Sequence, residues 1–206
     1  MPPRPLSQAQ HADRRALILR ETRALAREAG WGAVTMRAVA ERAGLSAPSV
    51  YEQFAGKDAL LAAVATAGFG ELASALRADA GGGLRRCAQC YWRVAETDPA
   101  LYELMFHRPL TLQFASAATP PELHDGFAAL ASHVVVAARD LGVTLADPDT
   151  ATEAWWSMLH GTVSLLLSGR LRPHPEPLLQ IAADTFAAGL RAGALTATND
   201  PRGTMA

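Results

Sequence analysis

Apolar side chains recur every three or four residues along almost the whole chain, and no stretch of five or more residues alternates convincingly between apolar and polar positions. The first pattern is typical of helices that bury one face. The runs of valine and isoleucine between turn residues that would indicate strands are missing from the sequence. We therefore predict an all-α fold of about nine helices.

Capping residues divide the N-terminal part of the chain. Gly30 follows one apolar pattern and is a typical helix stop, while Thr35 and Ser46 precede the next two patterns, where a side-chain oxygen caps the first turn. Gly44 separates these two segments, and a fourth pattern begins after Gly56. The predicted helices are residues 13–29, 35–43, 46–54 and 57–78.

The three consecutive glycines at residues 81–83 are the clearest helix breaker in the chain. Beyond them, Asp98-Pro99 and Asp147-Pro148 each supply an N-cap followed by a proline that is tolerated in the first turn. The later predicted helices are residues 84–95, 98–107, 121–141, 147–168 and 177–192. Residues 194–206 are small and polar, so we expect them to be disordered.

Composition places limits on the class of protein. Half of the 206 residues are hydrophobic, enough for a substantial core, and no uninterrupted apolar run approaches the ~18 residues of a membrane span. The first residues are polar and rich in proline, unlike a signal peptide. We therefore expect a soluble, cytoplasmic protein with no membrane partner.

The net charge of −1 conceals an uneven distribution. Residues 1–57 carry nine basic and five acidic side chains, whereas the rest of the chain carries ten basic and fifteen acidic ones. A basic N-terminal part on an acidic remainder favours contact between the N-terminal part and phosphate groups.

The segment from Thr35 to Phe54 has the spacing of a helix-turn-helix. Ala40 lies four residues before Gly44, where two helices must approach closely, and Gly44 permits the sharp turn between them. Apolar residues stand where the two helices would pack together, at Val39, Ala43, Leu45 and Val50. Such a unit binds DNA by placing its second helix in the major groove. The alternative interpretation of this segment is an ordinary helical hairpin.

The stretch TMRAVAERAGLSAPSVYEQFAGKDALLAAV, residues 35–64, resembles the TetR family of regulators. The resemblance rests on Thr-Met-Arg, Ala-Gly-Leu-Ser, Val-Tyr-x-x-Phe and Gly-Lys-Asp-x-Leu-Leu. It implies a DNA-binding head formed by the first three helices, residues 1–56. It also implies a ligand-binding body, residues 57–206, that dimerises through its last two helices.

Physical chemistry and the resemblance together assign roles in the head. Thr35, Arg37 and Lys57 lie at or near helix N-termini, where hydroxyls, backbone N–H groups and positive charges bind phosphates. The resemblance implies that the Tyr51 hydroxyl also contacts the DNA backbone. The predicted DNA-binding residues are Thr35, Arg37, Ser46, Ala47, Pro48, Ser49, Tyr51, Gln53 and Lys57.

Base reading falls to the start of the third helix. There Ala47 could touch a thymine methyl group and Ser49 could donate or accept a hydrogen bond. No arginine or asparagine stands there for a bidentate base contact, so Arg37 is a further candidate. Gln53 stands where the family often has histidine. Glu52 is either a solvated charge or an acceptor for a cytosine amino group.

A second resemblance concerns the body. AWWSMLHGTVSLLLSG, residues 154–169, resembles a C-terminal subgroup marked by Trp, His and Gly, which are Trp156, His160 and Gly161 here, and LYELMFHRP at 101–109 fits it too. An aromatic pocket with one imidazole suits a mostly apolar ligand with one polar group. The candidate ligand-binding residues are Phe69, Tyr91, Trp92, Met105, Phe106, Trp155, Trp156 and His160. Each of them could instead be a plain core residue.

The last predicted helix is apolar on more than one face, and Asp184 is the only charge in its middle. A surface helix needs only one apolar face. We therefore expect this helix and the preceding one to form the four-helix interface of a homodimer.

These features predict a transcription regulator, acting as a repressor, that binds a palindromic double-stranded DNA operator as a dimer. An unidentified small-molecule effector would release it, and no cofactor or metal ion is expected. The alternative is a helix-turn-helix protein without small-molecule sensing, such as a nucleoid-associated or division-linked regulator. A helical enzyme is disfavoured, because G-x-S-x-G, H-E-x-x-H and phosphate-binding loops are missing from the sequence.

The two cysteines, Cys87 and Cys90, have a C-x-x-C spacing that places them on one helix face. They could form a redox site or half of a metal site, with a reactivity tuned by Arg85 and Arg86. They could equally be two small buried side chains. The second interpretation is favoured, because no second C-x-x-C pair and no βαβ pattern accompany them.

Overall fold

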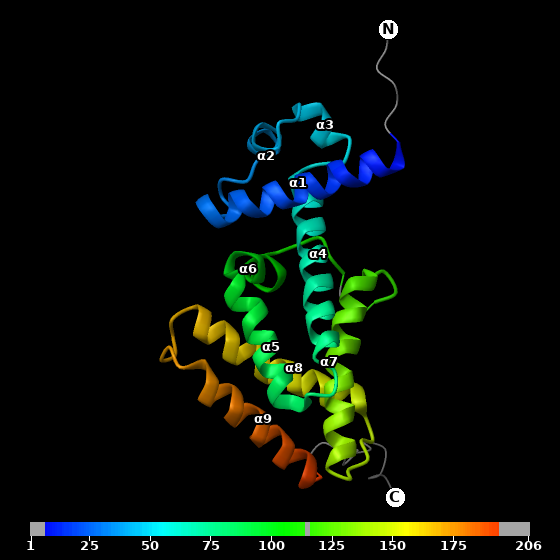
Figure 1. Cartoon of the computed structure of the whole chain (residues 1–206), viewed down its shortest axis with the longest axis vertical. Coiled ribbons are helices and arrows are strands. Elements are labelled where there is room, and N and C mark those ends of the chain that lie inside the picture. Colours follow the sequence, from blue (N-terminus) through cyan, green and yellow to red (C-terminus); the bar gives the residue numbers. More distant parts are fainter. Residues whose placement is uncertain (1–6, 114–115, 194–206) are drawn as a thin grey trace, which may run out of the picture. The chain divides into compact units, whose positions relative to one another are not determined.

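The computed structural model describes residues 7–113 and 116–193, and these contain nine helices and no strand (Figure 1). The helices are α1 (Gln8–Ala29), α2 (Met36–Arg42), α3 (Ala47–Tyr51), α4 (Lys57–Ala78), α5 (Gly83–Thr97), α6 (Pro99–His107), α7 (Pro121–Asp140), α8 (Pro148–Leu167) and α9 (Pro175–Arg191). The predicted all-α class is confirmed. The segment 194–206, expected to be disordered, lies outside the described residues.

The predicted start of the first helix at residue 13 is wrong, because α1 begins at Gln8. Ser7 and Gln10 form a capping box at this end. The backbone N–H of Gln10 donates to Ser7 Oγ at 3.3 Å, and the backbone N–H of Ser7 donates to Gln10 Oε1 at 2.8 Å. These two bonds satisfy backbone donors that a helix start leaves unpaired, so the helix extends further than its apolar face.

Further boundaries differ from the prediction, and two of them are informative. The third helix ends at Tyr51 rather than at residue 54. The chain continues in a turn in which the backbone N–H of Phe54 donates to the carbonyl of Val50 at 3.0 Å, and the Phe54 ring is buried. The last helix begins at Pro175, two residues before the predicted start, because proline is accepted in the first turn of a helix.

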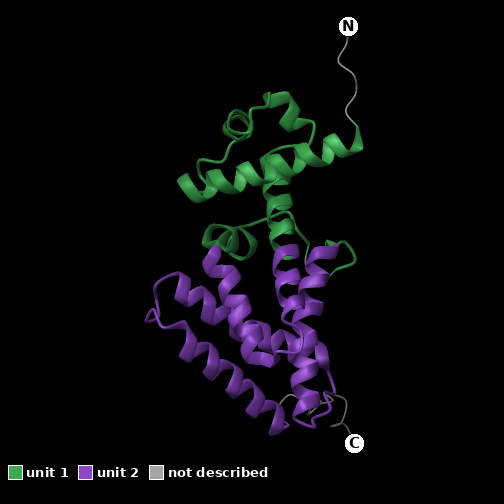
Figure 2. Cartoon of the chain, viewed as in Figure 1, with its two compact units in different colours: residues 1–69, 98–120 green, residues 70–97, 121–206 purple. Residues whose placement is uncertain are grey.

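The chain forms two compact units (Figure 2). Unit 1 spans residues 1–69 and 98–120, and so holds α1, α2, α3, the first part of α4 and α6. Its core includes four fully buried side chains, Ile18, Val39, Val50 and Leu60. Figure 1 shows α2 and α3 on one side of α1, and α2 contacts both α1 and α3.

Unit 2 spans residues 70–97 and 121–206, and so holds the last part of α4 together with α5, α7, α8 and α9. Helix α5 packs against α7, α8 and α9, and α8 also packs against α7 and α9. Val134, Trp155, Leu159 and Leu190 are fully buried in this unit.

The predicted functional boundary between residues 56 and 57 stays a prediction. The compact units divide the chain elsewhere, because the first part of α4 and the whole of α6 group with the three N-terminal helices. Helix α4 is continuous across this division, which falls after Phe69.

Among the described residues, α4 is the one helix that is long and apolar enough to cross a membrane, with a mean hydropathy of 1.6 over its most apolar window. Counting uninterrupted apolar residues in the sequence missed this, because Glu71 interrupts a run that is otherwise uncharged from Ala59 to Leu76. Half of that window is buried inside the protein, which is typical of the core helix of a globular fold.

Both cysteines are buried on the face of α5 that points into unit 2, with Cys87 0% and Cys90 2% exposed. The indole N–H of Trp155 donates to Cys87 Sγ at 3.4 Å. Burial raises the pKa of the Cys87 thiol to about 12, against the opposing effect of that hydrogen bond, and burial also raises the pKa of Cys90. Protonated, buried thiols are poor nucleophiles, as the structural interpretation of this pair requires.

We expect neither cysteine of the native protein to react with Ellman's reagent within minutes at about pH 8, since both thiols are inaccessible and protonated. Both should react at once in guanidinium chloride. A Gln89→Cys variant, which places a thiol on the exposed position between them, is the positive control. Rapid modification of the native wild-type protein would contradict a structural role.

Candidate DNA-binding surface and ligand-binding residues

Helices α2 and α3 pack against each other across a tight turn. The side chain of Thr35 caps α2 by accepting the backbone N–H of Ala38 at 3.1 Å. After α2, Gly44 adopts a φ of 64°, and the backbone N–H of Leu45 donates to the carbonyl of Ala40 at 2.9 Å. This is the Schellman arrangement, which needs a left-handed residue and therefore favours glycine. The predicted helix-turn-helix is confirmed in its geometry.

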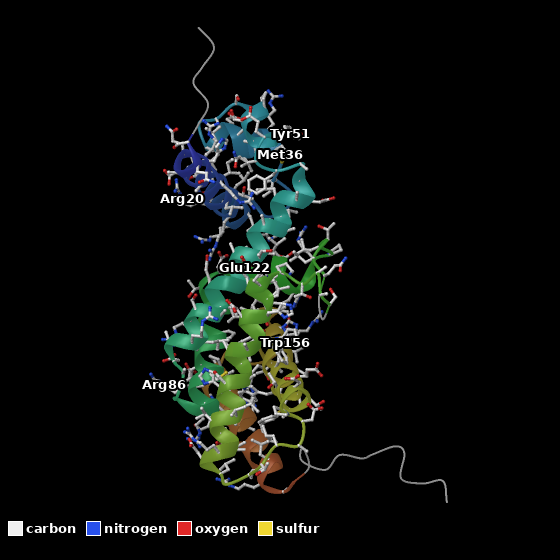
Figure 3. The ribbon with its side chains drawn as sticks, turned by 90° about the vertical axis from the view of Figure 1, so that its right-hand side faces the viewer. Arg20, Met36, Tyr51, Arg86, Glu122 and Trp156 are labelled. Atoms are coloured by element: carbon white, nitrogen blue, oxygen red, sulfur yellow. The ribbon has the colours of Figure 1, made fainter. Side chains whose placement is uncertain are left out.

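The predicted DNA-binding residues lie on the outside of this motif. Thr35, Arg37, Ser46, Pro48 and Tyr51 are exposed, and the Tyr51 side chain, labelled in Figure 3, is 55% exposed. The other four are half-buried, at Ala47, Ser49, Gln53 and Lys57. An exposed tyrosine at the end of a short helix is an uncommon use of a large apolar ring, and it suits contact with another molecule.

The start of α3 presents small side chains and two linked hydroxyls. Ser46 Oγ accepts the backbone N–H of Ser49 at 3.3 Å and lies 2.8 Å from Ser49 Oγ. A hydroxyl can donate and accept at once, so this pair keeps hydrogen-bonding capacity directed outward. Ala47 and Pro48 lie between them, so the side chains at the start of α3 are all short and another molecule could approach the helix backbone closely.

Three basic residues of α1 lie beside the end of α3, although none of them was among the predicted DNA-binding residues. His11 Nδ1 is 3.0 Å from Gln53 Nε2, and the Arg15 guanidinium donates to the Gln53 carbonyl at 3.3 Å. The same guanidinium lies 4.4 Å from the centre of the Phe54 ring, while Arg14 is 3.9 Å from the exposed Glu52 carboxylate. The capping pair Ser7 and Gln10 was the signal that could have extended the predicted helix to His11, whereas Arg14 and Arg15 already lay inside it and join this surface only through the packing of α1.

Some basic side chains around the motif are bound to other residues of the protein, and others are exposed to solvent. Arg42 is held by Glu28 at 2.6 Å and by Glu21 at 3.2 Å, and the hydrogen bond from Arg42 lowers the pKa of Glu28. Lys57 Nζ donates to the carbonyl of Trp31 at 3.4 Å, a long bond that positions the ammonium group at the start of α4. Arg37 is exposed and forms no ion pair within the described part of the chain.

Three of the candidate ligand-binding residues cluster in unit 1. The rings of Phe69 and Phe106 meet edge to face with centroids 5.2 Å apart, and Tyr102 lies 4.8 Å from Phe106. Helix α6 approaches α4 closely at Gly68, where a Cβ would lie 2.7 Å from Met105 Sδ. These side chains therefore form the contact between α4 and α6.

The other five candidates belong to unit 2 and fall into separate environments. The Trp156 side chain is labelled in Figure 3. Its indole N–H donates to the Tyr91 hydroxyl at 3.1 Å, and the rings of Trp156 and His160, four residues apart on α8, have centroids 6.4 Å apart. Trp155 is instead fully buried and packs on Phe186, with centroids 5.2 Å apart. Trp92 is half-buried on α5.

The chain matches the sequence patterns of two protein families. Residues 18–64 match the sequence pattern of the bacterial regulatory proteins of the tetR family, and residues 84–195, more than half of the chain, match the tetracyclin repressor-like C-terminal domain.

The chain belongs to the TetR family.

Solved structures share the fold of this TetR-family chain. A protein of unknown function from Rhodococcus sp. RHA1 is 23% identical with a TM-score of 0.71, over 93% of this chain and 99% of that one. A tetR-family transcriptional regulator from Streptomyces coelicolor is 21% identical with a TM-score of 0.63, over 90% and 87%. The protein RolR in complex with the ligand resorcinol is 19% identical with a TM-score of 0.63, over 91% and 94%. No curated protein matches the chain in sequence.

Membership of the TetR family identifies the protein as a DNA-binding transcription regulator with a helix-turn-helix. It leaves the roles of single residues as predictions. The subgroup marked by Trp156, His160 and Gly161 also stays a prediction, since the matched C-terminal pattern carries the broader description.

In this TetR-family chain, Asp98 joins α6 to α1 within unit 1. The residue is 2% exposed, and its carboxylate caps α6 by accepting the backbone N–H of Leu101 at 3.1 Å. The other oxygen accepts from the guanidinium groups of Arg23 and, at 2.9 Å, of Arg27. Burial alone would raise the pKa of Asp98, but the hydrogen bonds from Arg23, Leu101 and Arg27 outweigh burial and lower this pKa.

We expect Asp98→Asn to lower the free energy of unfolding by about 2–3 kcal/mol at neutral pH, because asparagine still caps α6 but removes the charge that neutralises Arg23 and Arg27. Since the folded-state pKa is depressed, this stabilisation is complete above the unfolded-state pKa of about 4 and is lost as the pH falls through the folded-state pKa. Urea unfolding of both proteins from neutral to acid pH measures the difference.

The control for this prediction is Asp140→Asn, which removes an exposed carboxylate that pairs with Arg139 at 2.9 Å. Its free energy of unfolding should change little, because exposed ion pairs contribute little. Equal effects of the two substitutions at neutral pH would show that the Asp98 cluster does not stabilise the fold.

Proposed function

We propose that this TetR-family regulator represses transcription by binding a palindromic operator as a homodimer, and that a small, mostly apolar ligand releases it. The observation that carries the proposal is an exposed helix-turn-helix on a chain whose C-terminal half matches the tetracyclin repressor-like domain. The structural neighbour RolR, which has bound resorcinol, supports a small aromatic ligand for a body of this fold.

Phosphate contacts position the head in this proposal. The Thr35 hydroxyl accepts a backbone N–H and still has its own hydrogen to donate to a phosphate. Arg37 and Lys57 add positive charge at the starts of α2 and α4, and Arg14 and Arg15 extend the basic surface along α1. These contacts supply affinity and salt dependence, and they carry no sequence information.

Base recognition then depends on the short side chains at the start of α3. The Ala47 side chain is small enough to let the helix approach the groove floor and to contact a thymine methyl group. Ser46 and Ser49 supply the hydroxyls for polar base contacts, and Arg37 is an exposed cationic side chain that could bind a guanine.

The dimer interface that we propose lies on α8 and α9. Ile181 is 61% and Leu165 39% exposed, which is unusual for large apolar side chains. On α9 the exposed or half-buried face also includes Leu178, Thr185 and Ala188. Asp184 is directed elsewhere, because Arg85 of α5 holds its carboxylate at 2.8 Å. The charge in the middle of α9 therefore does not interrupt the apolar face.

Helix α6 offers a path from ligand to head. Asp98 fixes its first turn to α1, and Trp31, which follows α1, donates its indole N–H to the carbonyl of Ala100 at 2.9 Å. The next turns of α6 contact α4 through Leu101 and Met105 at Gly68. In the proposal, a ligand that displaces α6 or α4 changes the angle of α1 and the spacing of the two recognition helices. Half-sites must lie about 34 Å apart, so a small change of spacing lowers affinity.

We expect Arg37→Ala to weaken operator binding and to reduce the slope of the logarithm of affinity against the logarithm of salt concentration by about 0.9, the effect of one lost phosphate contact. The operator is obtained as the genomic fragments that the purified protein retains, and affinity is measured by fluorescence anisotropy. Arg172→Ala, which removes an exposed charge in unit 2, is the control. An unchanged salt slope for Arg37→Ala would exclude a phosphate contact by this residue.

We expect Ile181→Glu to convert the dimer to a monomer and to lower operator affinity at least about tenfold, because a charge would be buried in the apolar interface. Sedimentation analysis gives the oligomeric state. Gln180→Glu adds the same charge at the neighbouring exposed position, and it should leave the dimer intact. A dimer that survives Ile181→Glu would place the interface elsewhere.

A further inference from the structure

His133 on α7 is a completely buried imidazole in unit 2, with 0% of its surface exposed. Its Nε2 lies 3.0 Å from the carbonyl oxygen of Leu76 in the last turn of α4. A carbonyl can only accept a hydrogen bond, so Nε2 must carry the hydrogen. In the neutral ring this contact therefore leaves Nδ1 with an unprotonated lone pair.

The Nδ1 atom of His133 is the only buried side-chain nitrogen or oxygen without a hydrogen-bond partner among the residues that the structure describes. Buried polar atoms are almost always paired, because an unpaired one loses its interaction with water and gains nothing in return. The tautomer makes Nδ1 an acceptor, so the missing partner is a hydrogen-bond donor.

Open space lies at one position, Gly126, on the same face of α7. Gly126 precedes His133 by two helical turns, roughly 10 Å along the helix axis, and so points in the same direction. Gly126 is buried, yet a Cβ built on it would meet no atom within 4 Å. Leu130, which is 3% exposed, lies on the turn between them and makes the surface apolar.

We propose that this face of α7 binds the effector, an apolar molecule with one hydroxyl or N–H group that donates to His133 Nδ1 and an apolar part that extends along Leu130 toward Gly126. The inference rests on the proposed ligand-sensing function and specifies its ligand class. An acceptor-only ligand would face a lone pair at Nδ1, and a fully apolar one would leave that atom unpaired. The donor is therefore the feature that the site selects.

The test uses three matched probes, para-propylphenol, its methyl ether and propylbenzene, with the full-length protein and isothermal titration calorimetry. They share the ring and the propyl chain, and only the phenol can donate a hydrogen bond. We expect the wild-type protein to bind the phenol at least about tenfold more tightly than either of the others, the usual effect of one matched buried hydrogen bond.

Two variants of His133 separate the roles of its nitrogens. In His133→Gln the amide Nε2 can still donate to the Leu76 carbonyl, but the acceptor at Nδ1 is lost. In His133→Asn an amide oxygen takes the place of Nδ1, and the bond to Leu76 is lost. We expect the glutamine variant to bind the three probes equally and the asparagine variant to keep the preference for the phenol. Gly126→Met, which extends into the open space, should weaken all three probes at least about tenfold, while Gly126→Ala should not.

The same samples are tested for retention of the operator fragments. If wild-type protein retains DNA but does not prefer the phenol, or if the glutamine and asparagine variants behave alike toward the probes, the inference about His133 is overturned and the DNA-binding proposal stands. If the wild-type protein retains no DNA, the proposed function itself fails. A phenol preference that only the glutamine variant loses establishes the site.

Discussion

Asp98 satisfies three demands at once, and the arrangement of unit 1 depends on it. Its carboxylate begins α6, neutralises two arginines of α1 and does so almost entirely out of water. A buried carboxylate is costly unless every lone pair has a donor, so the helix start, the guanidinium groups and the backbone N–H must stay together. The position of α6 relative to α1 is therefore held by directional bonds, and the apolar contact at Gly68 adds to this.

The helices were largely predictable because caps and stops are local. Thr35, Ser46 and Asp98 each cap the helix that follows them, and Gly44 closes α2 with a positive φ. Two errors in helix bounds have different origins, one local and one tertiary. A polar first turn such as residues 8–12 has no apolar periodicity, so only the Ser7 and Gln10 pair could reveal it. The early end of α3 depends on Phe54 turning into the core, a tertiary effect that no nearby residue specifies.

The candidate sites were predictable to different degrees. Residues of the helix-turn-helix follow one another in sequence, so their exposure could be deduced from the motif, whereas Arg14 and Arg15 join that surface only through the packing of α1. In unit 2 the sequence could not separate Trp155, which is core, from its neighbour Trp156, which bonds to Tyr91. The role of His133 could not be predicted, because no neighbouring residue in the sequence indicates that Nε2 is hydrogen-bonded and Nδ1 is not.

The apolar length of α4 has a consequence for biosynthesis. Beyond its first turn, where Lys57 contacts Trp31 and Leu60 is buried, α4 contacts residues further along the chain, including Leu101 and Met105 at Gly68, Phe106 at Phe69, and His133 at Leu76. The ribosome therefore synthesises an apolar segment of membrane-spanning length before it synthesises the later residues that cover that segment in the folded protein. During that interval the apolar surface of α4 is exposed, and exposed apolar surface on a nascent chain favours aggregation.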